Sequence, residues 1–164
     1  MASEVRIDRL EDALSRLAQA QAHTDESMRR LAVAQERTEE RVGRLEEAMA
    51  ALLYDVLKRE FGWEVGVLER PWQRWNGRVE AVDVFGRATD PARPARVIWI
   101  VGEAKHNLTL REVERFARQV KRARQHLVGE VYAVCFSYRA RPEVRARLQE
   151  LGLPLLFSYG RFAT

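Results

Sequence analysis

The sequence is poor in cysteine and in long uninterrupted hydrophobic runs. Cys135 is the only cysteine, so an intrachain disulfide is excluded, and we expect a reducing, cytoplasmic location with Cys135 as a thiol of the core. The apolar run "VIWIVG" is far shorter than the ~20 residues of a membrane-spanning helix. The N-terminus is acidic and amphipathic, which is not the pattern of a secretion signal. We therefore expect no membrane partner.

Acidic residues are in deficit only in the second part of the chain. Residues 57–164 contain 20 Arg and Lys against 12 Asp and Glu, whereas residues 1–56 contain 8 against 12. The net charge of +4 therefore conceals a strongly basic C-terminal part. Such an excess favours a polyanionic partner such as nucleic acid, although an Arg-rich solvated surface would have the same composition.

No proline interrupts the first 56 residues, and these follow a heptad pattern. The segment "RLAQAQAHTDESMR" is followed by the similar "RLAVAQERTEERVG", so the heptads also repeat in pairs. We predict a coiled-coil helix over residues 1–56 that makes a homo-oligomer through residues 7–56; a helix that docks on another protein is the alternative. The a positions are Ile7, Leu14, Gln21, Met28, Gln35, Val42, Met49 and Val56, and the d positions are Leu10, Leu17, Thr24, Leu31, Thr38, Leu45 and Leu52.

The rest of the chain, with its Gly and Pro signals, has the pattern of a mixed α/β domain over residues 46–164. The first helix ends at Gly62, and Asn76-Gly77 joins two strands as a hairpin. A third strand, "VIWIVGEAK", precedes a helix with a capping box at Thr109 and Glu112. The strand "VYAVCFSY", a helix from Pro142 to Gly152 and the strand "PLLFSYG" follow. The predicted order is helix, three strands, helix, strand, helix, strand.

Three charged residues interrupt the predicted central strands. Glu103 and Lys105 are two residues apart on one strand and share a face, while Asp83 lies on the preceding strand. Two carboxylates in a half-buried site repel each other unless a cation lies between them. Oxygen ligands of this kind suit Mg²⁺ or Mn²⁺, and a nearby ammonium suits a phosphodiester substrate. In isolation, Glu103 and Lys105 would instead be an ordinary cross-strand ion pair.

"VDVFG" and "VIWIVGEAKHN" resemble the two motifs of the PD-(D/E)XK nuclease superfamily, which has an αβββαβ core. More narrowly, the chain is similar to prokaryotic proteins in which a coiled coil runs into such a domain. The resemblance covers roughly residues 46–159 and implies a restriction-endonuclease-like α/β fold. It also implies catalytic roles for Asp83, Glu103 and Lys105.

The same resemblance implies a metal site and accessory residues. Asp83, Glu103 and the backbone carbonyl of Ala104 would hold Mg²⁺ or Mn²⁺. Glu47 best matches a glutamate that is common on the first helix of the family. Either Gln119 or Lys121 matches a residue that approaches the site from the helix after the third strand. Glu80 is either an additional ligand or a solvated carboxylate.

The hairpin segment "RPWQRWNGR" alternates basic and aromatic residues, a combination found on nucleic-acid-binding surfaces. Cross-strand aromatic packing would produce the same pattern. A second basic set lies on the following helix and either follows a phosphate backbone or keeps the domain solvated. The hairpin residues are Arg70, Trp72, Arg74, Trp75 and Arg78; the helical ones are Arg111, Arg115, Arg118, Arg122 and Arg124.

The sequence thus predicts a metal-dependent nuclease, with DNA as the expected partner and an endonuclease as the expected activity, oligomerised by its coiled coil. The alternative is a non-catalytic protein that binds nucleic acid or serves as a scaffold and retains the nuclease fold.

Overall fold

The computed structural model describes residues 2–163; Met1 and Thr164, the outermost residues of the two predicted domains, lie outside this range. Contacts divide the chain into a unit that ends at Arg41 and a compact unit that begins at Val42. The helix α1 (Ala2–Phe61) contributes to both units. Its length agrees with the uninterrupted heptad pattern. The last two heptads, however, belong to the second unit.

The C-terminal part of α1 is a core element of that second unit. Its buried residues include Leu45, Met49, Leu53 and Val56, spaced by three or four residues as on one face of a straight helix. The helix ends at Gly62, as predicted, because Gly62 adopts a positive φ of 71° and its N–H donates to the carbonyl of Lys58 at 2.9 Å.

The predicted hairpin is present, but each of its strands is broken into two. Strands β1 (Glu64–Glu69) and β4 (Val84–Thr89) pair in the main sheet, while β2 (Trp72–Trp75) and β3 (Arg78–Ala81) form a separate two-stranded ribbon. One break is at Pro71, which has no N–H to donate and whose carbonyl accepts from Val82. The turn at Asn76-Gly77 has positive φ at both residues, as in a type I′ hairpin.

The main sheet continues with β5 (Ile98–Leu108), β6 (Glu130–Ala140) and β7 (Leu155–Phe157) in the order β1-β4-β5-β6-β7. The pairs β1–β4 and β4–β5 are antiparallel, and β5–β6 and β6–β7 are parallel. Helices α2 (Leu110–His126) and α3 (Pro142–Glu150) make the parallel connections, and the capping box at Thr109 and Glu112 is formed. The predicted αβββαβ order is confirmed.

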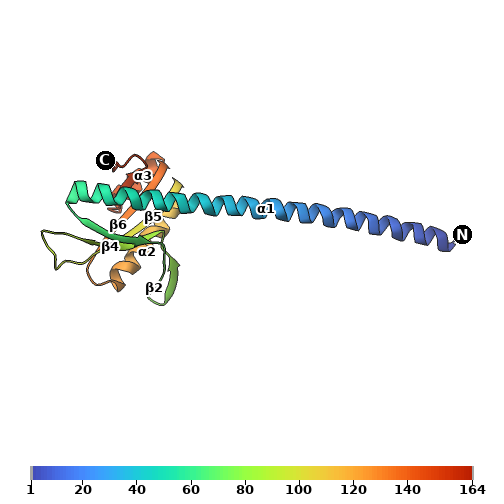
Figure 1. Cartoon of the computed structure of the whole chain (residues 1–164), viewed down its shortest axis with the longest axis horizontal. Helices are drawn as coiled ribbons and strands as arrows, with labels where there is room; N and C mark the ends of the chain where they lie inside the picture. Colours follow the sequence, from blue (N-terminus) through green and yellow to red (C-terminus); the bar gives the residue numbers. More distant parts are fainter. Residues whose placement is uncertain (1, 164) are drawn as a thin grey trace. The chain divides into compact units, whose positions relative to one another are not determined.

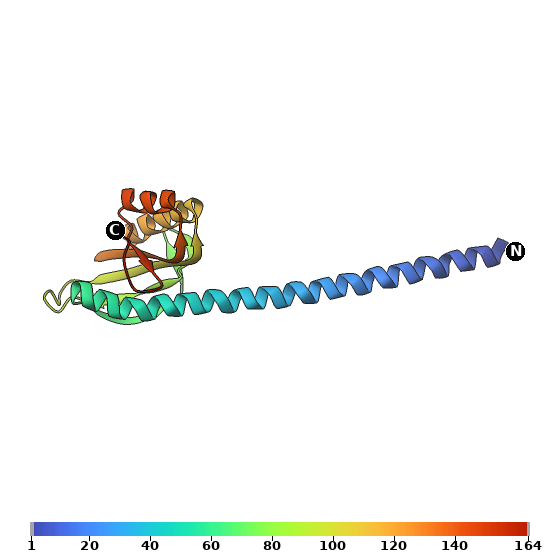
Figure 2. The same ribbon diagram turned by 90° about the horizontal axis from the view of Figure 1, so that it is seen from above.

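Two hydrophobic clusters lie on the two faces of the main sheet. The C-terminal part of α1 covers one face, and α2 and α3 cover the other (Figures 1 and 2). One contains α1 residues such as Met49 with Ile100 and Phe136; the other contains α2 and α3 residues such as Phe116 with Val101. Gly102 lets α1 approach β5, because a Cβ there would lie 2.6 Å from the Met49 side chain. No helix among residues 2–163 is long and apolar enough to cross a membrane.

Candidate active site

Asp83 lies at the break between β3 and β4, just before the first residue of β4. The break leaves the N–H of Ala104 on β5 without a strand partner at this point, and Asp83 Oδ2 accepts from it at 3.0 Å. The Asp83 carboxylate therefore accepts the hydrogen bond that the backbone of an uninterrupted neighbouring strand would accept. Because the N–H and C=O of one residue point to the same side of an antiparallel strand, we place the Ala104 carbonyl on the Asp83 side as well.

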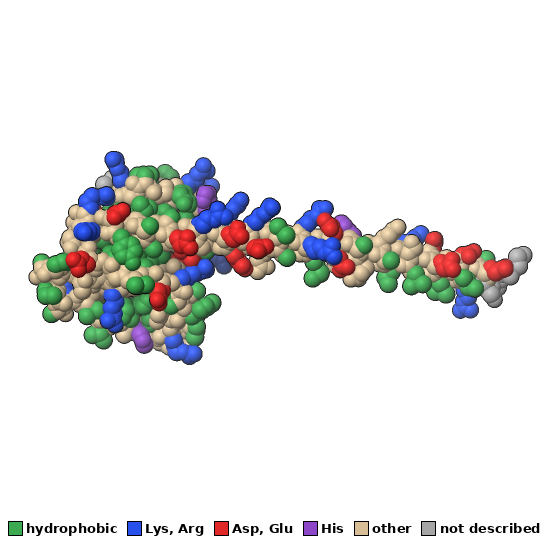
Figure 3. Space-filling model, viewed as in Figure 1, with side chains coloured by type: hydrophobic (Ala, Val, Ile, Leu, Met, Phe, Trp, Pro, Cys, Tyr) green, Lys and Arg blue, Asp and Glu red, His purple; other side chains and the backbone are tan. Residues whose placement is uncertain are grey.

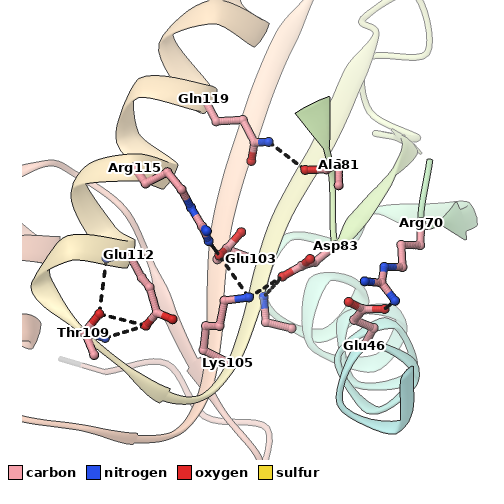
Figure 4. Close-up of polar contacts among 11 residues, drawn as sticks. Glu46, Arg70, Ala81, Asp83, Glu103, Lys105, Thr109, Glu112, Arg115 and Gln119 are labelled. Carbon is pink, nitrogen blue, oxygen red and sulfur yellow. Dashed lines mark hydrogen bonds and ion pairs between the residues drawn. The ribbon is translucent and has the colours of Figure 1, made fainter. Parts of the chain in front are cut away.

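Glu103 and Lys105 project from β5 on the face covered by α2 (Figure 4). The Lys105 ammonium lies 3.4 Å from Glu103 Oε1 and 3.6 Å from Asp83 Oδ2. The side chains are only 26% (Lys105), 5% (Glu103) and 11% (Asp83) exposed. This is a largely buried group of three charges from two neighbouring strands, and not the solvated surface ion pair that Glu103 and Lys105 alone would predict.

The helix carboxylate of the site is Glu46 and not Glu47. Glu46 is 6% exposed and interacts with Asp83, whereas Glu47 is exposed to solvent. Glu47 was chosen because heptad position f points away from the seam, but the structure does not bring it to the site. The seam residues Leu45 and Met49 themselves pack on the sheet, so position f faces solvent and the adjacent position e, Glu46, is buried. Arg70, directly after β1, lies 3.2 Å from Glu46 Oε2; Glu46 Oε1 is buried without a hydrogen-bond partner among the described residues.

Burial and mutual repulsion shift the protonation of these groups. Burial, followed by repulsion from Asp83, raises the pKa of Glu46 from 4.5 to about 7. The same two causes raise the pKa of Glu103. Burial alone would lower the pKa of Lys105, but the carboxylates of Glu103 and Asp83 outweigh it and raise that pKa. Lys105 is therefore a permanent cation at neutral pH, while Glu46 is near its midpoint.

The Glu46 pKa predicts a pH-dependent stability in metal-free buffer. Between pH 4.5 and about 7 the folded protein holds a proton on Glu46 that the unfolded chain has lost, so stability decreases as pH rises through this window. The maximum loss is roughly 3 kcal/mol, at ~1.4 kcal/mol per pH unit. We expect Glu46→Gln, which stays neutral, to flatten the profile and to be more stable than the wild type at pH 8, as measured by urea unfolding in EDTA.

The matched control for that experiment is Glu47→Gln, which makes the same chemical change on the adjacent, exposed residue. Its profile should overlay the wild type. Because the pKa of Glu103 is raised too, Glu46→Gln should retain a shallower slope of the same sign. Identical profiles for Glu46→Gln and the wild type would show that Glu46 is ionised in the folded protein throughout this range.

Arg115, on α2, completes the charged group by pairing directly with Glu103 (Figure 4). The sequence indicated only that Arg115 belongs to a basic helix face. Its position one helical turn after Glu112, on the helix that begins right after the Glu-x-Lys strand, is the signal that could have identified it. Glu46 and Arg115 are thus the two site residues that sequence reasoning missed.

The other predicted accessory residues have structural partners. Glu80 is mostly buried and pairs with Arg122 through two hydrogen bonds, so it is neither solvated nor free to bind a metal without breaking that pair. Gln119 is buried, and its side-chain amide donates to the carbonyl of Ala81 at 2.9 Å, which fixes the chain two residues before Asp83. Lys121 lines a different cavity, next to Arg124 and Leu151.

A cavity of about 260 Å³ opens in front of these residues. It has room for part of a nucleotide and a few water molecules. One wall comes from β3 and the Asp83 break, the floor from β5, and the opposite wall from α2. The lining residues are Arg78, Val79, Glu80, Ala81, Asp83, Glu103, Lys105, Arg115 and Gln119.

The donor set fits a small hard divalent cation with few protein ligands. Asp83 and Glu103 both lie within 3.6 Å of the same Lys105 nitrogen, so their oxygens face a common space. Mg²⁺ is commonly held by one or two carboxylates, with water and substrate phosphate completing its shell. In the described part of the chain, no group of three or more His, Cys, Asp or Glu side chains is placed to surround a metal.

The hairpin residues predicted to contact nucleic acid separate into two sets. Trp75 is completely buried and packs against Phe85, so its predicted role in base stacking is wrong: its strand position turns it into the core. Trp72 and Arg74 lie on the opposite face of β2 and are exposed, Trp72 by 74%. Arg78 is exposed at the cavity rim, and Arg70 is held by Glu46.

Known proteins similar to this chain are found by structure and not by sequence. No family model matches the sequence, and none of the curated proteins matches it. The structure is similar to the apo form of EndoMS, with a TM-score of 0.44 and 16% identity over 67% of this chain and 44% of that one. It is also similar to a repair endonuclease from Pyrococcus abyssi, with a TM-score of 0.45 and 20% identity over 68% of this chain and 45% of the other. This chain spans less than half the length of either protein.

Proposed function

We propose that the protein is a metal-dependent nuclease that hydrolyses phosphodiester bonds, and that its substrate is DNA, cut internally. The observation that carries this proposal is the convergence of Asp83, Glu103 and Lys105 on one open cavity. The neighbouring side chains, Glu46 and Arg115, add one carboxylate and one cation to the same group.

The energetics of this group support a functional role over a structural one. Buried charges are costly. A buried carboxylate with a raised pKa indicates that nearby cations do not fully compensate for its burial and for repulsion from other carboxylates. Glu46, Asp83 and Glu103 place three carboxylates near one lysine, and the raised pKa values of Glu46 and Glu103 report the resulting strain. An arrangement selected for stability alone would use fewer buried acids.

The roles of the residues follow from their positions. Asp83, Glu103 and the Ala104 carbonyl would hold Mg²⁺ or Mn²⁺, which when bound supplies an acidified water and charge neutralisation at a phosphate. Lys105 presents a permanent ammonium to the cavity, where it would stabilise the negative charge that develops on the phosphoryl oxygens. Arg115 fixes the Glu103 carboxylate, and Gln119 fixes the backbone before Asp83.

The ribbon β2–β3 is the proposed contact surface for nucleic acid next to the cavity. Trp72 pairs with Ala81 and Arg74 pairs with Val79, and both partners line the cavity. The exposed Trp72 ring and Arg74 guanidinium therefore lie on the strand that pairs with the β3 wall of the cavity. An exposed indole can stack on a base while a guanidinium contacts the phosphates.

We expect Trp72→Ala to weaken DNA binding about 5- to 150-fold, because loss of one base–aromatic stack costs ~1–3 kcal/mol. Trp72→Phe keeps an aromatic face and should recover most of the affinity. Fluorescence anisotropy with a labelled oligonucleotide in Ca²⁺ or EDTA measures both. Equal affinities for the wild type and Trp72→Ala would exclude this surface as the stacking platform.

The alternative, a non-catalytic binding or scaffold protein, is distinguished by a substrate panel. Double-stranded DNA, single-stranded DNA and RNA of one sequence should be incubated with the protein and Mn²⁺, with EDTA as the control. The nuclease proposal predicts internal cleavage of at least the double-stranded DNA in Mn²⁺ only. Binding of all three substrates without cleavage of any would favour the alternative.

A further inference from the structure

The helix α1 exposes a hydrophobic stripe over its N-terminal part, in the unit that ends at Arg41 (Figure 3). The six apolar a and d residues of this stripe are each 53% to 71% exposed, a large apolar surface for a single helix. They are Ile7, Leu10, Leu14, Leu17, Met28 and Leu31. The polar seam residues Gln21, Thr24, Gln35 and Thr38 lie on the same line.

The seam available to a partner ends before the second unit. Leu45, Met49 and Val56 continue the a/d pattern, but they are buried in the core of their own domain. They cannot also pack against a second helix. The self-association predicted for residues 7–56 is therefore limited to the ten seam positions from Ile7 to Thr38.

This limit disfavours an antiparallel pairing of two copies. An antiparallel coil places a positions against d positions of the partner. The antiparallel register that matches polar residues sets Gln21 against Thr38 and Thr24 against Gln35. That register also sets Leu14 against Leu45, which is already buried in its own domain.

The antiparallel registers that avoid the buried residues match apolar with polar side chains. Centring the overlap on the available seam sets Ile7 against Thr38 and Leu10 against Gln35. Shifting the overlap by one heptad toward the N-terminus sets Leu14 against Thr24 and Leu17 against Gln21. Each such layer buries an amide or hydroxyl against a hydrocarbon side chain without a partner, which is unfavourable.

A parallel, in-register pairing avoids these mismatches. Each of the six apolar residues then meets its own copy, and so does each of the four polar ones. A parallel shift by two heptads, which the sequence repeat would allow, sets Ile7 against Gln21 and shortens the overlap. Only the unshifted parallel pairing keeps every layer uniform.

The charges that flank the seam agree with this orientation. Up to Arg41, every charged residue at position e is acidic (Glu4, Glu11, Asp25 and Glu39) and every charged residue at position g is basic (Arg6 and Arg41). A parallel coil brings g next to the following e of the partner, so Arg6 meets Glu11 of the second copy. An antiparallel coil brings e to e and g to g, which juxtaposes like charges.

We propose that the segment from Glu4 to Arg41 forms a parallel, in-register coiled coil with a second copy of this chain. Because the compact unit follows Arg41 directly, this pairing places both compact units after the same end of the coil. If the proposed nuclease function holds, one assembly would thus carry two cleavage sites, one for each strand of a duplex.

Cysteine cross-linking tests the orientation. Leu10→Cys lies near one end of the seam, and in a parallel in-register coil the two new thiols face each other within disulfide range. Under mild oxidation, more than half of the chains should become disulfide-linked dimers, and Leu17→Cys should behave the same way. Gln19→Cys, at the outward position f, is the control and should stay unlinked. The natural Cys135 is fully buried and does not interfere.

Two results would overturn the proposal. If Leu10→Cys alone fails to link but a mixture of Leu10→Cys and Gln35→Cys chains links efficiently, the pairing is antiparallel. If no variant forms a disulfide-linked dimer and the wild type sediments as a monomer at micromolar concentration, the hydrophobic stripe binds a different protein. Neither readout involves metal or DNA, so this proposal and the proposed nuclease function can fail independently.

Discussion

Lys105→Ala should reduce the rate of DNA cleavage by about 10²- to 10⁴-fold, the usual effect of removing one group that acts on charge or protons in a transition state. The ammonium is the only lysine nitrogen among the cavity-lining residues, and the carboxylates of Glu103 and Asp83 keep it protonated. DNA affinity should change little, because the proposed binding surface lies on the ribbon. Single-turnover cleavage with saturating protein separates the chemical step from binding.

Lys121→Ala is the matched control, because Lys121 is an exposed lysine on α2 that lines a different cavity. It should cleave at the wild-type rate. Equal cleavage rates for Lys105→Ala and Lys121→Ala would show that Lys105 takes no part in the chemical step. A melting curve of each variant verifies that any loss of activity is not a loss of the fold.

Millimolar Mg²⁺ or Mn²⁺ should raise the melting temperature of the wild type by on the order of 10 °C. A ligand at 100 times its Kd stabilises the folded state by about 2.7 kcal/mol, which gives a shift of this size in a domain of ordinary length. Asp83→Asn should abolish the shift, because it removes one of the two carboxylates that would share the cation. Differential scanning calorimetry with and without metal measures both effects.

The metal-free form of Asp83→Asn should be as stable as the wild type or more stable. An Asn carbonyl can still accept the hydrogen bond from Ala104 N–H, and the repulsion with Glu46 is removed. Asp90→Asn is the control, since Asp90 also accepts a backbone N–H at 3.0 Å but lies outside the site. If the charged residues were only an ion pair, metal would have no effect, and Glu103→Gln would cause a small loss of stability.

The sequence predicted the order of elements because local signals and hydrophobic periodicity agreed over most of the chain. The heptads indicated α1, the Asn-Gly pair located the hairpin turn, and the Thr109–Glu112 box marked the start of α2. The division of the hairpin into β1–β4 and β2–β3 was missed, because it depends on how Pro71 and Asp83 interrupt pairing in three dimensions.

Only the residues of the candidate site that lie on strands could be predicted from the sequence. A two-residue period fixes which side chains share a face, so Glu103 and Lys105 could be placed together from sequence. Glu46 could not, because the sequence does not show that the heptad seam of α1 leaves the coiled coil and packs on the sheet, which buries position e and leaves position f in solvent. Trp75 was misplaced for a related reason: strand alternation does not reveal which face of an isolated ribbon is buried.

The most direct test of the metal-dependent site is the conversion of supercoiled plasmid to nicked and linear forms by the purified full-length protein in Mn²⁺. The wild type should cleave, EDTA should stop the reaction, and Glu103→Gln should be inactive while still binding the plasmid. Cleavage by Glu103→Gln at the wild-type rate, or a folded wild type that binds plasmid in Mn²⁺ and leaves it intact, would contradict the assignment of Asp83, Glu103 and Lys105 as a nuclease site.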